Sequence, residues 1–143
     1  MLAACQALDS IPERPVDTAS VQFGNAGSIV GGGLITEVYP NDQAYRWYRG
    51  TRAGDDRTEW YQLPAGSFDQ VKALALAQFP QLPATQDAPV CMDAGEDILI
   101  VVDAAANRRA YQNTCPTDAA RAAFSDLRAE VTRQIAVAKD QGL

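Results

Sequence analysis

Residues 97–103 read Asp-Ile-Leu-Ile-Val-Val-Asp, and this stretch gives the strongest indication of the fold in the sequence. Five consecutive β-branched or leucine residues favour a β-strand, and an uninterrupted apolar run indicates a strand that is buried on both faces. Residues 104–107 (Ala-Ala-Ala-Asn) form a predicted turn into a second strand over 108–113. We therefore expect a β-hairpin whose first strand lies inside a sheet.

Two cysteines, Cys91 and Cys115, flank this hairpin. Pairing the strands across the turn brings the two cysteines close together, so we expect a disulfide, which is typical of oxidising compartments. Two buried free thiols are the alternative. Two thiolates without histidine would leave a tetrahedral zinc ion half-ligated, so we expect no metal there.

Helices are predicted on either side of the hairpin. Thr117 is the expected N-cap of the last helix, whose apolar positions recur every three or four residues. The earlier helix is expected to begin at Ser67, with Gln70 completing a capping box, and Pro80 stops its extension. The apolar face of the last helix comprises Ala120, Phe124, Leu127, Val131, Ile135 and Ala138.

Four short strands are predicted before the first helix, over residues 20–23, 34–39, 44–49 and 57–63. Turn-forming residues separate them, which favours an antiparallel meander. The predicted fold is therefore α+β, an antiparallel sheet in the order β-β-β-β-α-β-β-α with two helices packed on one face. We expect a single domain over residues 19–140, preceded by residues 1–18 as a tether or extended arm.

Glycines cluster over residues 24–33, including Gly31, Gly32 and Gly33. A strand follows them rather than a helix, so the stretch is interpreted as a β-hairpin and not as a phosphate-binding loop. The order of strand, glycine-rich turn, strand and helix over roughly residues 19–79 resembles emfourin-type inhibitors of bacterial metalloproteases. The resemblance implies inhibition of a protease as one function, and it assigns no inhibitory residues.

Aromatic residues and arginines concentrate in residues 44–63, which we call the aromatic hairpin. Both tryptophans lie here, and four arginines alternate with them against three acids. Trp, Tyr and Arg dominate protein interfaces, whereas the alternative interpretation is a core face with arginine stems covering the other side. Alternation places Tyr45, Trp47 and Arg49 on one face, and Arg46 and Tyr48 on the other. The candidate partner-binding residues are Tyr45, Arg46, Trp47, Tyr48, Arg49, Arg52 and Trp60.

Composition narrows the function further. The 143 residues carry a net charge of −6 and no histidine. The acidic balance argues against nucleic acid and anionic membranes as electrostatic partners. The absence of histidine excludes Ser-His-Asp and Cys-His catalysis and histidine-ligated metals. No apolar run approaches the length of a transmembrane helix.

Residues 2–5 read Leu-Ala-Ala-Cys, which resembles the lipobox of bacterial lipoproteins. The resemblance implies cleavage before Cys5 and lipid modification of Cys5, hence a periplasmic protein anchored to a bacterial membrane. No basic and apolar leader precedes the motif, so this interpretation requires a natural start upstream of Met1.

Catalysis has weak support. Asp93, Glu96 and Asp97 cluster before the buried strand, and paired carboxylates serve glycoside hydrolysis only at a defined separation. Ser67 has only Lys72 and Lys139 as lysine bases in the chain. We expect no enzyme and no cofactor, but a lipid-anchored envelope protein that binds another protein as an accessory subunit or inhibitor. A small carbohydrate-binding or hydrolytic periplasmic module is the alternative.

Overall fold

A computed structural model of the chain describes residues 19–27, 32–50, 55–83, 91, 95–115 and 117–143. They form one six-stranded antiparallel sheet and two α-helices, which confirms the expected α+β class and element order. A short 3-10 turn, η1 (Phe79–Gln81), follows the first helix. The strands are β1 (Ser20–Asn25), β2 (Leu34–Val38), β3 (Gln43–Tyr48), β4 (Arg57–Gln62), β5 (Asp97–Val102) and β6 (Arg108–Asn113), and the helices are α2 (Ser67–Gln78) and α3 (Asp118–Asp140).

The strand order in space is β4-β3-β2-β1-β5-β6. The first four strands form the expected meander, and β5 returns after α2 to pair with the outer edge of β1. Val21 of β1 consequently lies opposite Val38 on one side and Val101 on the other. Gly24 of β1 has a φ of 136°, and a Cβ there would lie 2.1 Å from the carbonyl oxygen of Leu34, so this position requires glycine.

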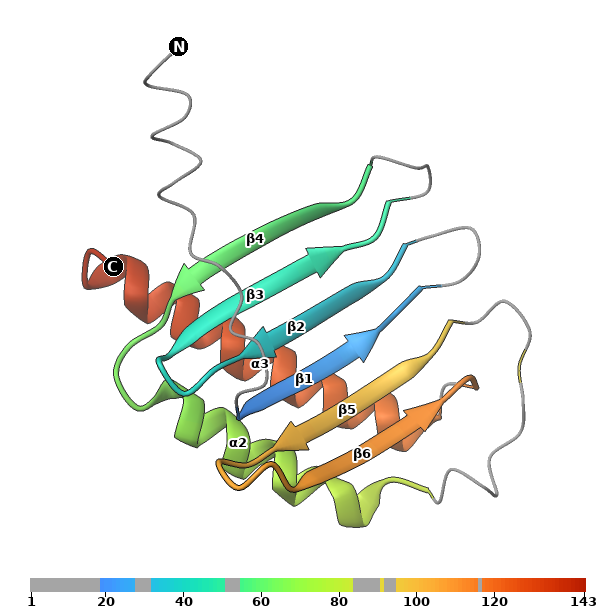
Figure 1. The fold of residues 1–143 in the computed structure, drawn as a ribbon. Helices are drawn as coiled ribbons and strands as arrows, with labels where there is room; N and C mark the ends of the chain where they lie inside the picture. The colour runs from blue at the N-terminus through green and yellow to red at the C-terminus, as the bar shows by residue number, and fades with distance from the viewer. Residues whose placement is uncertain (1–18, 28–31, 51–54, 84–90, 92–94, 116) are drawn as a thin grey trace.

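Both helices cover the same face of the sheet (Figure 1). This face is apolar because alternate residues of β1 and β5 point toward the helices, as the period of two in a strand dictates. The helices contribute the residues of their apolar stripes, including every position predicted for α3. The core contains Val21, Phe23, Val38, Leu99, Val101, Phe68, Val71, Phe124, Leu127 and Val131.

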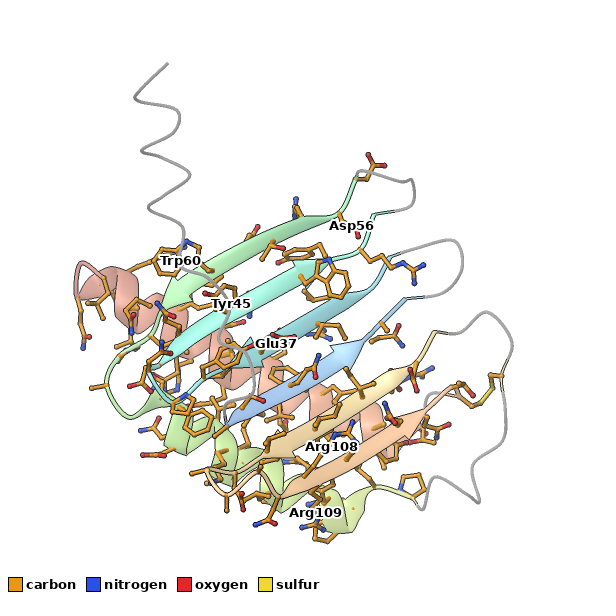
Figure 2. The ribbon with its side chains drawn as sticks, in the orientation of Figure 1. Glu37, Tyr45, Asp56, Trp60, Arg108 and Arg109 are labelled. Carbon is orange, nitrogen blue, oxygen red and sulfur yellow. A yellow bond between two sulfur atoms is a disulfide. The ribbon has the colours of Figure 1, made fainter. Side chains whose placement is uncertain are left out.

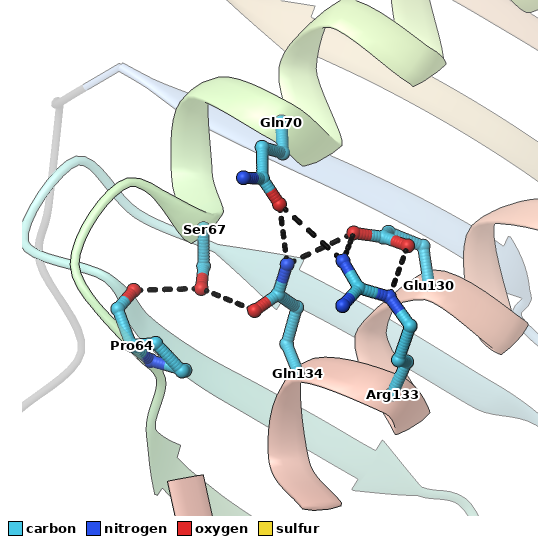
Figure 3. Close-up of polar contacts among 6 residues, drawn as sticks. All are labelled: Pro64, Ser67, Gln70, Glu130, Arg133 and Gln134. Carbon is cyan, nitrogen blue, oxygen red and sulfur yellow. Dashed lines mark hydrogen bonds and ion pairs between the residues drawn. The ribbon is translucent and has the colours of Figure 1, made fainter. Parts of the chain in front are cut away.

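A polar cluster joins α2 to α3 beside this core (Figure 3). The Gln134 side chain accepts a hydrogen bond from the Ser67 hydroxyl at 3.0 Å and donates to Gln70 Oε1 at 2.5 Å and Glu130 Oε1 at 2.9 Å. Arg133 binds the Glu130 carboxylate through two nitrogens, at 2.7 and 3.0 Å. The pairing of the helices is therefore specified by directional bonds as well as by apolar packing.

The two helix starts differ from each other. Thr117 caps α3 as expected, because its side chain accepts a hydrogen bond from the amide of Ala120 at 3.1 Å. The capping box predicted at Ser67 and Gln70 is wrong. Ser67 is already the first helical residue and turns its hydroxyl to Pro64 O and Gln134. The carboxylate of Asp42, in the turn between β2 and β3, accepts instead from the amides of Gly66 and Phe68.

The expected disulfide between Cys91 and Cys115 is present. It ties the end of β6 to the segment that precedes β5, which matches the pairing of these two strands. Neither helix in the described part of the chain is both long enough and apolar enough to cross a membrane.

Candidate functional site on the aromatic hairpin

Strands β3 and β4 place the aromatic hairpin at one edge of the sheet. Tyr45 lies opposite Trp60, and Trp47 lies between Ile35 of β2 and Thr58 of β4. Directly paired residues share a face, so these side chains lie on the side away from α2 and α3. We call this side the helix-free face, and Figure 2 shows Glu37, Tyr45 and Trp60 on it. The helix-free face carries Ile35, Glu37, Tyr45, Trp47, Trp60, Ile98 and Ile100.

The two tryptophans are the large exposed groups of this face. Trp47 is 43% exposed and Trp60 is 37% exposed, whereas Tyr45 between them is only 4% exposed. Trp47 also borders a hollow of about 170 Å³ that it shares with Ile35, Gly33, Ala26 and Arg49. The exposed guanidinium of Arg49 lies 3.4 Å from the carbonyl oxygen of Ala26 at this hollow. An apolar wall beside a cation is thus open to solvent at the end of β3.

Arg46 and Tyr48 point to the opposite, helix-facing side, as alternation predicts. Arg46 donates to Thr132 Oγ1 of α3 at 3.0 Å, and its buried Nε has no hydrogen-bond partner among the described residues. The Arg57 guanidinium stacks on the Tyr48 ring at 4.2 Å. Arg46 thus connects the hairpin to α3, and Arg57 and Tyr48 connect its two strands on the side opposite the tryptophans.

On the same side, Tyr61 donates a hydrogen bond to Glu59 Oε2 at 2.6 Å. That bond raises the pKa of the Tyr61 hydroxyl, with a smaller contribution from partial burial. A tyrosine hydroxyl is already neutral at physiological pH, and this bond moves its pKa further from that range.

Glu37 is a buried carboxylate at the centre of the helix-free face. It accepts hydrogen bonds from the Tyr39 hydroxyl at 2.5 Å and from Gln22 Nε2 at 3.1 Å. Tyr39 in turn packs edge-on against Tyr45, with ring centroids 5.8 Å apart. Sequence reasoning missed Glu37, although a signal was available. Ile35 and Glu37 alternate in the same strand, so a single acid shares a face with apolar neighbours.

The remaining predicted residues fall in several places. Cys5, Arg52 and Asp93 lie outside the described residues. Asp97 is buried on the helix-facing side and accepts from Asn25 Nδ2 at 2.8 Å, so it serves the packing of β1 against β5. The structure therefore does not bring Asp97 into the aromatic surface. Its neighbour Glu96 uses its backbone carbonyl to accept from the amide of Ala26.

No protein-family model matches this chain, and a search of the curated proteins finds no match either. The function must therefore be argued from the site itself.

Proposed function

We propose that the protein is a non-catalytic, lipid-anchored envelope protein that binds another protein through Trp47, Trp60 and Arg49. The observation that carries this proposal is the pair of exposed tryptophans on neighbouring strands, beside an arginine-lined hollow. Large aromatic groups and arginine supply most of the binding energy at protein interfaces. Monomeric proteins rarely leave such groups clustered at the surface without a role.

The compartment is part of the proposal. The Cys91–Cys115 disulfide is of the kind that persists outside the reducing cytosol. Cys5 in the Leu-Ala-Ala-Cys motif would carry the lipid anchor, and residues 6–18 would lead from the anchor to the sheet. The partner would be an envelope protein for which this chain acts as an accessory subunit or inhibitor.

Purification from native membranes in mild detergent, followed by mass spectrometry, tests the proposal. We expect a stoichiometric protein partner, and Trp47→Ala or Arg49→Ala should weaken its binding about 30-fold, or about 2 kcal/mol, if either is a hot spot. Arg108→Ala is the matched control, because Arg108 is also exposed on the helix-free side of the sheet but lies on β6. A chain that elutes alone, or three variants with equal affinity, would contradict the proposal.

A second candidate is carbohydrate binding, because exposed tryptophan rings also stack on sugars. A glycan array separates the two functions. Binding to a defined glycan that is lost in Trp47→Ala, with no co-purifying protein, would favour this second function.

A further inference from the structure

A hollow of about 310 Å³ lies on the helix-facing side of the sheet, where β1 ends and β5 begins. Helix α3 passes across this side of the sheet (Figure 1) and forms the opposite wall of the hollow. The sheet contributes Asn25 and Asp97 to its lining, and α3 contributes Arg121, Ser125 and Arg128. The volume is at the lower end of the range for small-molecule sites, so it suits a small ligand.

The sheet wall of the hollow holds a buried carboxylate with a single partner. Asp97 is 5% exposed, and its Oδ1 accepts from Asn25 Nδ2 at 2.8 Å. In the described part of the chain this is the only hydrogen bond of the carboxylate, and no cation pairs with it. Burial of a carboxylate without a positive partner is unfavourable. Asp97 is therefore suited to receive a cationic group from a ligand.

The helix wall of the hollow carries the opposite charge. Arg121, Ser125 and Arg128 follow one face of α3, because they are spaced by four and three residues. Arg121 has one exposed ion pair, at 3.8 Å from Asp118 Oδ1, and among the described residues Arg128 has none. Exposed ion pairs contribute little, so a ligand can displace the one at Arg121. Guanidinium groups bind carboxylates through two parallel hydrogen bonds, so this wall is suited to a carboxylate.

We propose that this hollow binds a small zwitterion, an amino acid or a dipeptide, through both of its charged groups. The ammonium group lies against Asp97, and the carboxylate lies against Arg121 and Arg128, with the Ser125 hydroxyl as a further donor. A simple anion would face the Asp97 carboxylate, whereas a simple cation would face the two guanidinium groups. A ligand that carries both charges satisfies both walls of the hollow.

This site is separate from the partner-binding surface of the proposed function. It lies on the helix-facing side of the sheet and uses none of the residues assigned to partner binding. Failure of either proposal would therefore leave the other unaffected. The inference also gives a ligand to Asp97, which the sequence singled out beside Asp93 and Glu96.

An NMR titration of the full chain, followed at its backbone amides, tests the inference. The probes are glycine and L-alanyl-L-alanine, which differ in the spacing between their ammonium and carboxylate groups. We expect one of them to cause saturable shifts at Asn25, Asp97 and Arg128. An equimolar mixture of acetate and methylamine carries the same charges on separate molecules and should bind about tenfold more weakly or less. The zwitterion with the higher affinity identifies the ligand as an amino acid or a dipeptide.

Substitutions on the two walls give a second readout. Asp97→Asn and Arg128→Gln should each weaken binding about tenfold or more, because each removes a charged hydrogen-bonding group. Asp97→Asn keeps an oxygen that can accept from Asn25, and Arg128 is exposed, so the second variant serves if the first does not fold. Lys139→Gln is the matched control and should change nothing, because it removes an exposed cation of α3 about three turns beyond Arg128.

The inference fails if neither zwitterion shifts these amides. It also fails if acetate alone binds as tightly as the better zwitterion, because the hollow would then be a plain anion site to which Asp97 contributes nothing. Equal affinity in the parent chain and Arg128→Gln would likewise contradict it.

Discussion

Asp42 has a left-handed backbone, with a φ of 61°, and its carboxylate caps a helix that begins 25 residues later. Both carboxylate oxygens are used, by the amides of Gly66 and Phe68 at 3.1 and 2.8 Å. These bonds satisfy amides at the start of α2 that have no partner within the helix.

Replacing Asp42 with alanine removes both carboxylate acceptors. It also places alanine, which has no polar side chain to support the conformation, in the left-handed region. We expect Asp42→Ala to lower the free energy of unfolding by about 2 kcal/mol, measured by urea denaturation. Asp42→Asn should lose less, because asparagine tolerates the left-handed conformation and keeps one oxygen acceptor. Equal losses in both variants would show that the cap contributes little.

This cap also shows why sequence reasoning failed at the same helix. Ser67 and Gln70 have the spacing of a capping box, but the Ser67 hydroxyl forms a hydrogen bond with Gln134 of α3 instead. The capping-box rule considers only residues that are close in sequence. Asp42, which accepts from the helix amides, and Gln134, which bonds to Ser67, are both distant from Ser67 in the sequence. The N-cap at Thr117 was predicted correctly because its donor, Ala120, is three residues away.

We expect Arg46 to contribute less to the stability of the fold than its position among the aromatic residues implies. Its Nε is buried and has no hydrogen-bond partner in the described part of the chain, which is unfavourable, and one guanidinium nitrogen donates to Thr132. Arg46→Met keeps much of the packing volume and removes the unpaired donor, so we expect the free energy of unfolding to stay within about 1 kcal/mol of the parent. Urea denaturation checks this, and a loss above about 2 kcal/mol would contradict it.

At the scale of elements, the stability of α3 should depend on pH through Glu130, whose carboxylate is bonded to Arg133 and Gln134 of the same helix. Bonds from Arg133 hold the pKa of this carboxyl below its ordinary value of 4.5, helped by Gln134 and opposed by partial burial. A pKa lowered by folding contributes stability above the unfolded value and loses it as the pH falls through the folded value.

We therefore expect Glu130→Gln to be less stable than the parent near neutral pH, and we expect this difference to shrink as the pH falls below 4.5 and through the lowered pKa of Glu130. Urea denaturation across this range measures the difference. Asp126→Asn, which changes an exposed acid of the same helix, should show a much smaller dependence. A Glu130→Gln deficit that persists unchanged in acid would show that the ion pair is not its cause.

The disulfide should stabilise the hairpin of β5 and β6 by restricting the unfolded chain. For a separation of 24 residues the chain-entropy estimate is about 3.5 kcal/mol. We expect the Cys91→Ser, Cys115→Ser variant to lose about this much in urea denaturation. The Cys5→Ser variant controls for cysteine removal and should lose nothing, and an unchanged double variant would refute the expectation.

The elements themselves were predictable because their patterns are local. The apolar run of β5, the alternation in β3 and the apolar stripe of α3 all appear within one stretch of sequence each. The pairing of β1 with β5 was not predictable in this way, because neither strand has a local sequence pattern that indicates which strand it pairs with. The faces of the aromatic hairpin were predicted, and the burial of Tyr45 fits the alternative of a core face, whereas the burial of Glu37 emerged only from the structure.

At the scale of the whole molecule, tryptophan fluorescence can test whether Trp47 and Trp60 are both exposed on the helix-free face. We expect acrylamide to quench the fluorescence of Trp47→Phe and Trp60→Phe variants alike, since the remaining tryptophan is partly exposed in each. A blue-shifted, unquenched emission in either variant would show that one of the tryptophans is covered. In the presence of a bound partner, quenching should fall in both.

The strand order has a consequence for synthesis on the ribosome. Asn25 of β1 is 72 residues from its partner Asp97 in β5, so one edge of β1 has no partner strand while the chain between them is made. At cellular translation rates this interval lasts roughly 4–14 s. The inner strand β1 therefore waits for β5 throughout this interval, and the sheet is complete only after β6 has also emerged.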